Sequence, residues 1–378
     1  MDKLGDAVTC FALDLFKKIS ETNAVGNVFY SPMSICSALA MVFVGARGST
    51  ESQMKKTLHF NKVDDIHSQF QTLNAAINKP DASFILRLAN RLYGEKAFNF
   101  LPQFLESTAK FYQATLSPVD FIGAFEEARE QINKWVEGQT EGKIQDLLAS
   151  GTVNSLTRLV LVNAIYFKGS WAEKFDEGAT QDMKFRLNKN ETKPVKMMYQ
   201  KKKFPFRYIP EMNLRVLELP YKGKDLSMIV LLPDDISDDS TGLKQLEKEL
   251  SMEKIKEWTS PEYMGHIDVH VHLPKFKLED KYDLESTLAE MGMSDLFDGS
   301  KADLSGITGK TDLHISKVAH KSFIEVNEEG TEAAAATAGI AMFCMFLEEN
   351  FTADHPFLFF IRHNQTNSIL FFGRFSSP

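Results

Sequence analysis

The feature that most constrains this chain is a series of strand-like apolar runs that extends over most of its 378 residues. The runs are rich in Val, Ile, Leu and Phe, and turn-forming residues separate one run from the next, as expected of β-strands. They are residues 83–94, 157–167, 213–221, 226–235, 266–278, 314–326, 356–362 and 368–375. Because helical patterns gather early in the chain, the sequence predicts an α+β fold with large antiparallel or mixed sheets.

Three helices are predicted in the first half of the chain. Residues 1–20 repeat apolar positions at helical spacing with acidic residues among them, so we expect a folded amphipathic helix and not a cleaved signal peptide. A second helix should begin with Ser31 as N-cap and Pro32 at the first helical position. Residues 125–139 form a third, charged amphipathic pattern.

The chain contains no Pro-, Gly- or Ser-rich linker and no repeat that would divide it. Its length exceeds that of the usual single domain. Strand-like runs near both ends must nevertheless contact one another to form sheets. We therefore predict one large domain over residues 1–378.

Charge and hydropathy exclude two classes of partner. The chain has 43 Lys and Arg against 51 Asp and Glu, a net charge of -8, whereas phosphate binding requires a basic face. The main basic run, Lys201, Lys202 and Lys203, is interpreted as a solvated hairpin end. No run of eighteen apolar residues exists, so no membrane-spanning helix is expected.

The cysteine count indicates the compartment. Cys10, Cys36 and Cys344 are too few and too scattered for a disulfide framework, and an odd count leaves one thiol unpaired. A reducing, cytoplasmic location fits this pattern best.

The sequence motifs that are typical of enzymes are incomplete or missing in this chain. Residues 138–144 resemble a phosphate loop, but one residue is missing between the glycines and Ile144 replaces the magnesium ligand. His270 and His272 share a strand face, yet no further metal ligand lies near in sequence. Cys344 lacks the local signatures of cysteine proteases, and no G-x-S-x-G motif occurs. We therefore expect no enzyme, no cofactor and no metal.

Four polar residues lie in apolar surroundings and must find partners if they are buried. They are Ser31, Ser34, Asn163 and His320. Spacing alone leaves open whether they form one hydrogen-bonded cluster or are satisfied independently.

The segment "EEGTEAAAATAGIAMFCMF", residues 328–346, is unusual near the end of a soluble chain. Its alanines favour helix by propensity. Apolar residues would surround such a helix on all sides, however, so a surface helix here would have no polar face.

These residues identify a family. Residues 327–341 resemble the hinge of an inhibitory serpin's reactive loop, and residues 351–361, "FTADHPFLFFI", resemble the serpin signature that follows it. Residues 27–35, "NVFYSPMSI", and 163–171, "NAIYFKGSW", resemble two further serpin blocks. The resemblance covers the whole chain and is strongest to the intracellular, ovalbumin-like (clade B) branch.

The resemblance implies a serpin fold and a suicide inhibitor. The expected fold has a large central β-sheet with further sheets, helices clustered on one side and an exposed reactive loop at about residues 328–350. A serine protease would attack the loop and form an acyl-enzyme, after which the cleaved loop would insert as a strand into the central sheet. The implied partners are granule-type proteases (neutrophil elastase, proteinase 3, cathepsin G and chymotrypsin-like enzymes), and the protein should be a monomer. Release from the cell without a cleaved signal peptide is a second option beside the cytoplasm.

The side chains of the loop suit insertion. Alternate residues of a strand face opposite sides, which gives two sets. The uncharged set is Thr331, Ala333, Ala335, Thr337 and Gly339, and the other is Glu332, Ala334, Ala336, Ala338 and Ile340. We therefore expect the first set to face the core and Glu332 to face outward.

The resemblance implies a functional role for each residue of this chain that matches a serpin motif. The hinge is Glu328, Gly330, Thr331, Ala333, Ala334, Ala335 and Ala336, and Gly330 supplies the conformational freedom for the turn. The breach, where insertion starts, is Trp171, Lys275 and Glu328. The shutter beneath the opening sheet is Ser31, Ser34, Asn163 and His320.

The family's loop length places the scissile bond at Cys344–Met345, where a small-to-medium apolar residue suits elastase-like pockets. Phe343 or Phe346 would serve chymotrypsin-like pockets if the register shifts. A non-inhibitory serpin acting as a binding or chaperone module is the alternative. Such a protein would tolerate large or charged hinge residues, which Thr331 and the neighbouring alanines are not.

Overall fold

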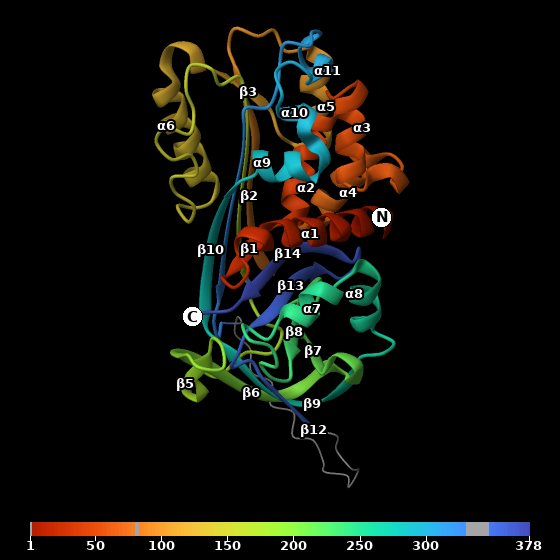
Figure 1. The fold of residues 1–378 in the computed structure, drawn as a ribbon, viewed down its shortest axis with the longest axis vertical. Helices are drawn as coiled ribbons and strands as arrows, with labels where there is room; N and C mark the ends of the chain where they lie inside the picture. The colour runs from red at the N-terminus through yellow and green to blue at the C-terminus, as the bar shows by residue number, and fades with distance from the viewer. Residues whose placement is uncertain (1, 80–82, 330–347) are drawn as a thin grey trace.

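The computed structural model describes residues 2–79, 83–329 and 348–378. The described chain is elongated, with a five-stranded sheet in the upper half of Figure 1 and a nine-stranded sheet in the lower half. The two sheets and the surrounding helices confirm the α+β class predicted from the sequence.

The five-stranded sheet joins strands from the first, middle and last thirds of the chain. In spatial order they are β10 (Phe276–Asp283), β11 (Lys317–Val326), β4 (Leu159–Gly169), β2 (Phe84–Glu95) and β3 (Leu116–Val119). The β10–β11 and β2–β4 pairs are antiparallel, whereas β11–β4 and β2–β3 are parallel.

The nine-stranded sheet contains the remaining strands. In spatial order they are β1 (Val28–Tyr30), β14 (Ser368–Phe375), β13 (Phe357–His363), β8 (Leu226–Pro233), β7 (Leu214–Pro220), β6 (Thr192–Ile209), β9 (Gly265–Pro274) and β12 (Glu348–Thr352), with β5 (Gln181–Arg186) paired to β6.

Most helices lie around the upper half of the molecule, on one face of the five-stranded sheet (Figure 1). The α-helices are α1 (Asp2–Thr22), α2 (Pro32–Phe43), α3 (Gly48–Thr57), α4 (Ile66–Ile77), α5 (Pro102–Tyr112), α6 (Phe121–Gln139), α7 (Lys244–Glu249), α8 (Met252–Trp258), α9 (Glu285–Leu288), α10 (Ser294–Phe297) and α11 (Ser305–Thr308). Short irregular helices are η1 (Phe60–Lys62), η2 (Glu177–Ala179), η3 (Pro210–Met212) and η4 (Ala289–Met293).

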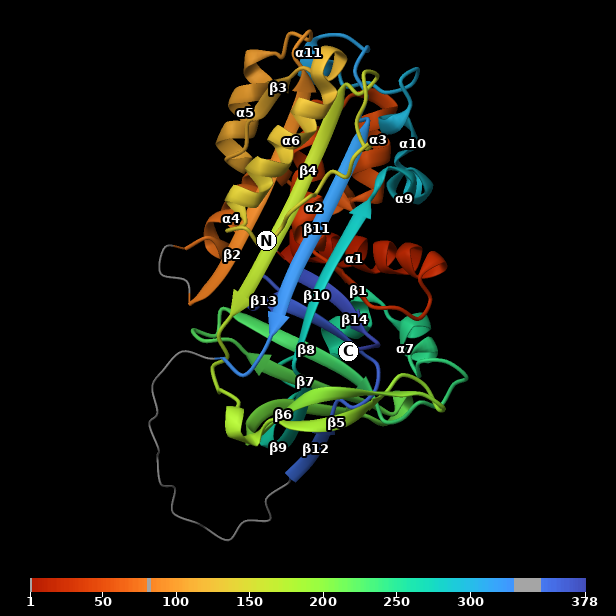
Figure 2. The ribbon, with the colours of Figure 1, turned by 90° about the vertical axis from the view of Figure 1, so that its left-hand side faces the viewer.

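The helix α6 covers the opposite face of the five-stranded sheet (Figure 2). Its N-terminal amides are held from two sides, because Asp120 accepts from the backbone N–H of Gly123 at 2.7 Å. The buried carboxylate of Glu95, at the end of β2, accepts from the N–H groups of Phe121 and Ile122 at 2.7 and 3.0 Å. Negative oxygens at a helix N-terminus are favourable, so these two acids fix where α6 starts on the sheet.

The strand β4 lies between two hydrophobic cores. Leu161 and Ile165 point into the main core, which contains residues of both sheets, and Val162 and Ala164 pack under α6. A strand that is buried on both faces gives a nearly continuous apolar run, as the sequence shows here. The shared main core is consistent with one domain over residues 1–378, which stays a prediction.

The structure confirms the predicted helix after Ser31, whose side chain accepts from the N–H of Ser34. Two predictions from the sequence were wrong. The run 266–278 is not one strand, since it leaves the nine-stranded sheet after β9 and enters the five-stranded sheet as β10. The lysines 201–203 are exposed but lie inside β6 and not at a hairpin end; since successive side chains of a strand point to opposite faces, both faces of β6 are solvated here.

Candidate functional site

The candidate site is the seam between the parallel strands β4 and β11, which lie side by side in Figure 2. Their register runs from Lys317 opposite Val160 to Ile324 opposite Phe167. At the lower end of the seam β11 continues through Asn327 to Glu329, where this described range ends. The chain is next described from Glu348, at the start of β12.

Trp171 closes the lower end of the seam. Its indole N–H donates to the backbone carbonyl of Asn327 at 2.8 Å, and its backbone N–H donates to that of Glu329 at 3.4 Å. The indole stacks on Tyr221 with ring centroids 4.6 Å apart. Trp171 therefore ties the chain leaving β11 to the end of β4.

Glu328 is held by two partners on other elements. Its side chain accepts from Lys275 Nζ at 2.8 Å and from the Thr180 hydroxyl at 2.7 Å, and only 5% of the residue is exposed. Burial raises the pKa of this carboxyl, but the bonds from Lys275 and Thr180 outweigh burial and bring the pKa below its usual value. The hydrogen bond to Glu328 in turn raises the pKa of Lys275.

The three predicted breach residues thus meet at one place. Sequence analysis did not identify Tyr221 or Thr180, which lies between η2 and β5 and is distant in sequence from Glu328. The adjacent ion pair between Lys168 and Glu329, at 2.9 Å, was also missed. A polar residue on an irregular turn has no periodic pattern that could reveal its role.

The four polar residues predicted for the shutter form one hydrogen-bonded cluster in the middle of the seam. His320 on β11 lies directly opposite Asn163 on β4, and its Nδ1 is 2.6 Å from Asn163 Oδ1. The amide nitrogen of Asn163 donates to the hydroxyl of Ser34. The backbone N–H of Ser31 donates to His320 Nε2 at 3.2 Å.

The cluster also reaches the nine-stranded sheet. The hydroxyl of Ser31 donates to the carbonyl of Leu370 on β14 at 2.6 Å and accepts from the N–H of Ser34 at 3.2 Å. A neighbouring residue that the sequence analysis missed, Ser322, donates to the carbonyl of Phe29 at 2.9 Å. The start of α2 is therefore bonded to both sheets.

The bonds of His320 assign its tautomer. Complete burial lowers the pKa of this histidine to about 3, so the ring is neutral at pH 7. Because the N–H of Ser31 can only donate, Nε2 must accept and Nδ1 must carry the proton that Asn163 Oδ1 accepts. Each buried polar atom named here then has a partner, as buried groups require.

Other predicted positions lie outside the described residues. They are Gly330, Thr331, Ala333, Ala334, Ala335, Ala336, Cys344 and Met345.

Within residues 2–79, 83–329 and 348–378, no group of three or more His, Cys, Asp or Glu side chains is arranged to hold a metal ion. His270 instead contacts the Tyr199 hydroxyl at 2.9 Å, and His272 contacts Thr352 at 3.4 Å. Among the described helices, none has both the length and the apolar character needed to cross a membrane.

Comparisons with known proteins agree with this geometry. The family profile described as "Serpin (serine protease inhibitor)" matches residues 6–378. Proteins named leukocyte elastase inhibitor from Homo sapiens and Xenopus laevis are 64% and 65% identical over 100% of both chains. A crystal structure of maspin superposes with a TM-score of 0.94 at 38% identity, covering 100% of this chain and 99% of that one. Uncleaved ovalbumin superposes with a TM-score of 0.92 at 42% identity over 100% of both chains. The chain belongs to the serpin family of serine protease inhibitors.

Proposed function

We propose that this serpin inhibits elastase-like and chymotrypsin-like serine proteases as a suicide substrate that is cleaved at Cys344–Met345. The protease would attack the carbonyl of Cys344, form an acyl-enzyme and release the amine of Met345. The segment that ends at Cys344 would then insert between β4 and β11 with the protease attached. Relatives at 64% and 65% identity carry the name leukocyte elastase inhibitor, which supports neutrophil elastase as the first target to test. Proteinase 3 and cathepsin G are the further granule proteases proposed.

The observation that carries the proposal is the parallel pairing of β4 and β11 at the root of the candidate loop. A segment that turns back after β11 runs antiparallel to β11, and therefore also antiparallel to β4. One inserted strand would thus replace a parallel interface with two antiparallel ones, which are slightly more stable per residue. Serpin loop insertion is a recognised case of strand addition to a sheet.

The energy of insertion is sufficient in magnitude. About 14 inserted residues, at roughly 1 kcal/mol for each new backbone hydrogen bond, would stabilise the sheet by on the order of 10 kcal/mol. Separation of the strands would break the bond between His320 and Asn163, which costs about 1 to 3 kcal/mol if the groups find no new partner. Insertion also breaks the parallel β4–β11 pairing, but the inserted strand forms two interfaces in place of that one, so insertion would remain favourable after cleavage.

The hinge residues support this direction of movement. Thr331, Ala333 and Ala335 are small and uncharged, so they would enter the buried face of the sheet at little cost. In this proposal the contacts of Trp171 and Glu328 form the breach that must open first. The His320–Asn163 bond forms the shutter that opens next.

The choice of bond rests on the sequence. Cys344 offers a small-to-medium apolar side chain of the kind that elastase-like pockets accept. The stretch from Cys344 to Asn350 has no proline and is one residue shorter than expected for this branch. A shift of register would place Phe343 or Phe346 in the pocket and favour chymotrypsin-like proteases.

The decisive experiment mixes the protein with neutrophil elastase and separates the products by SDS gel electrophoresis. We expect an SDS-resistant complex, and mass spectrometry should find a released peptide that begins at Met345. Complete cleavage without complex would instead favour the non-inhibitory alternative. A peptide that begins at Cys344 or Leu347 would move the bond to Phe343 or Phe346.

The proposed setting follows from the sequence alone. A monomeric inhibitor in the cytoplasm would act on proteases that escape their granules, and release from the cell would bring it to extracellular proteases. Size-exclusion chromatography and cell fractionation test these two points.

A further inference from the structure

Two sulfur atoms from distant parts of the chain meet where α1 packs on α8, two helices that lie next to each other in Figure 1. The thiol Sγ of Cys10 on α1 lies 3.7 Å from the thioether Sδ of Met252, the first residue of α8. Both residues are half-buried. Because 242 positions separate them in the chain, no local sequence motif indicates the pair.

The pair lines a cavity of about 220 Å³. Asp6 and Ala7 of α1 and His59 at the start of η1 line the same cavity. A water molecule occupies about 30 Å³ in the liquid, so the cavity has room for an ion and several waters beside the sulfurs. A ligand from solvent therefore has access to Cys10 and Met252.

The spacing of the two sulfurs suits one shared metal ion. Metal–thiolate bonds are about 2.3 Å long, so two sulfurs on one ion can be at most about 4.6 Å apart. The distance of 3.7 Å between Cys10 Sγ and Met252 Sδ lies within this limit. The unbranched side chain of Met252 can also adjust around its rotatable bonds, so binding requires no rearrangement of the helices.

The donor atoms select a soft cation. Thiolate and thioether ligands favour copper(I), whereas calcium and magnesium take oxygen ligands. A structural zinc ion usually takes four ligands, and the described parts of the chain offer no group of even three His, Cys, Asp or Glu side chains for a metal. Copper(I) is therefore the biological ion that fits a pair of Cys and Met.

Negative charges around Cys10 favour a cation at its sulfur. Burial is the main cause that raises the pKa of this thiol, and three nearby carboxylates raise it further: Asp14, Glu253 and Asp6. The nearby cation, Lys256, acts in the opposite direction but is paired with Asp6 at 2.5 Å. The free thiol is therefore protonated at pH 7, and a bound metal displaces this proton.

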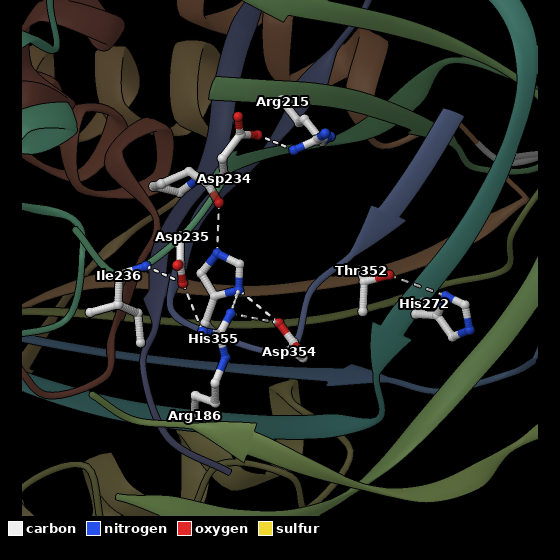
Figure 3. A network of polar contacts seen from close by, with 10 residues as sticks. Arg186, Arg215, Asp234, Asp235, Ile236, His272, Thr352, Asp354 and His355 are labelled. Carbon is white, nitrogen blue, oxygen red and sulfur yellow. Dashed lines mark hydrogen bonds and ion pairs between the residues drawn. The ribbon is translucent and has the colours of Figure 1, made fainter. Parts of the chain in front are cut away.

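Another cavity lined by sulfur provides a comparison. It has a volume of about 250 Å³, and Met183, Met197 and His272 lie in its wall. Figure 3 shows the ring of His272 directed at Thr352, whose hydroxyl lies 3.4 Å from Nδ1. The described residues that line this cavity include no thiol. Because cysteine binds metals as the charged thiolate, whereas a thioether is neutral, this cavity should bind copper(I) more weakly.

We propose that Cys10 and Met252 bind one copper(I) ion through their two sulfur atoms. The S–H bond of Cys10 breaks, a Cu–S bond forms in its place, and the proton passes to solvent. The charges of copper(I) and the thiolate cancel, and no electron is transferred. The ion joins α1 to α8 at a site that involves neither β4 nor β11, so this inference does not depend on the proposed inhibition.

A metal-transfer titration tests the site. The starting protein is Cys344→Ser, because the loop thiol would otherwise compete for copper, whereas Cys36 is fully buried. Copper(I) is supplied without oxygen as its complex with the chromophoric chelator bicinchoninate, whose absorbance falls as the protein takes the metal. We expect one copper(I) ion per chain. No transfer to this protein would overturn the proposal.

Substitutions in the same background assign the ligands. Cys10→Ser should abolish the transfer. Met252→Leu should weaken binding about tenfold or more, because changes outside the ligand shell already cost roughly 10- to 100-fold in metal affinity. Met183→Leu is the matched control, a half-buried methionine in the wall of the other cavity, and should leave binding unchanged. Transfer that Cys10→Ser or Met252→Leu leaves at the starting level would contradict the proposed ligands.

X-ray absorption at the copper edge gives a readout that does not require a variant. The loaded Cys344→Ser protein should show two sulfur neighbours at about 2.3 Å from copper, and Met252→Leu should show one. If Cys10→Ser does not fold, the spectrum of the starting protein decides. A single sulfur neighbour in that spectrum would leave no role for Met252 and would overturn the proposal.

Discussion

His320 Nδ1 lies 2.6 Å from Asn163 Oδ1, so one side-chain hydrogen bond joins the parallel strands β11 and β4 at the middle of their seam. Both side chains also contact the start of α2 through Ser31 and Ser34. The bond is therefore part of the native packing and must also break before a strand can enter the seam. Stability and inhibition should both depend on these residues.

Asn163→Ala should lower the free energy of unfolding by about 2 to 3 kcal/mol, because it leaves the buried Nδ1 proton of His320 without an acceptor. Urea denaturation at pH 7.5 measures the change. The matched control is Asn90→Ala, since Asn90 faces Asn163 in register on β2 while its Oδ1 has no partner among the described residues. Equal losses for the two variants would show that the hydrogen bond to His320 contributes nothing specific.

The protein should lose stability as the pH falls below about 6.5, in part through His320. The pKa of the folded residue, about 3, lies below the unfolded value of about 6.5, so folding favours the neutral ring. The stabilisation is complete above pH 6.5 and is lost as the pH falls toward 3, at about 1.4 kcal/mol per pH unit.

Urea unfolding of wild type and His320→Gln between pH 7.5 and 5 isolates this residue. Burial also lowers the pKa values of His67, His272, His314 and His363, so the wild-type slope contains several contributions. The variant should be less stable at pH 7.5, but its free energy of unfolding should fall less steeply with decreasing pH. The difference in slope should correspond to about one proton fewer bound on unfolding. If the free energy of unfolding depends on pH equally in both proteins, His320 is not the neutral, buried group described here.

At the lower end of the seam, Lys275→Met should lower the free energy of unfolding by about 1 kcal/mol, since it removes one of the two donors to the buried carboxylate of Glu328. The side chain of Lys275 is 46% exposed, so solvent screens this pair and limits the effect. The control is Lys277→Met on the adjacent strand. Its partner Glu325 is 3.5 Å away and the lysine is 65% exposed, so the change should stay within about 0.5 kcal/mol. If Lys277→Met lowers the free energy of unfolding more than Lys275→Met does, the pair between Lys275 and Glu328 is not the more stabilising of the two.

Much of the fold could be predicted because most strands carry their own pattern. The run 157–167 is apolar at nearly every position because β4 is buried on both faces. By contrast, β6 was missed because three consecutive exposed lysines, on both faces of the strand, resemble a turn. The break between β9 and β10 was missed because apolar residues recur at every second position on both sides of Pro274 and Lys275.

In the candidate site, too, local sequence patterns predict some residues and not others. Asn163 and His320 could be noticed because polar residues in apolar runs need partners, but only the register of β4 and β11 brings them opposite each other. Pairing across more than 150 residues cannot be obtained from local spacing. Thr180 has no such signal, since a threonine on an exposed turn is unremarkable until Glu328 is placed beside it.

In the proposed loop, Thr331→Arg should convert the inhibitor into a substrate. The first inward side chain would then have to bury an unpaired guanidinium at a cost of several kcal/mol. Insertion would stall while acylation continued, and deacylation would release active protease. The ratio of SDS-resistant complex to cleaved protein measures this partition.

Glu332→Arg is the matched control for that variant, because the neighbouring position is assigned to the outward face. It should keep nearly the wild-type yield of complex. If both variants reduce the yield of complex equally, the effect comes from introducing an arginine into the loop and not from the face to which that residue points. If Thr331→Arg keeps the full yield, the assigned face is wrong.

Oxidised glutathione should lower the rate of elastase inhibition, and reductant should restore it, if Cys344 fills the specificity pocket of the protease. A bulky mixed disulfide at that position would block docking, whereas the same adduct at a remote thiol would not. Stopped-flow inhibition assays with untreated, oxidised and re-reduced protein measure the effect. We expect at least a tenfold loss of rate, since a displaced docking contact of about 1.4 kcal/mol already gives that factor.

The other two cysteines should react slowly, which makes the assay specific. Cys36 is fully buried and burial raises its pKa well above the usual value, and burial together with Asp14 raises the pKa of the half-buried Cys10. A raised pKa leaves little of the thiolate that attacks a disulfide. Cys344→Ala should still inhibit elastase but should lose the response to glutathione, whereas Cys10→Ala should retain it. If modification of Cys344 leaves the rate of elastase inhibition unchanged, the scissile bond lies after Phe343 or Phe346. An adduct on a thiol outside the protease's specificity pocket would not block docking.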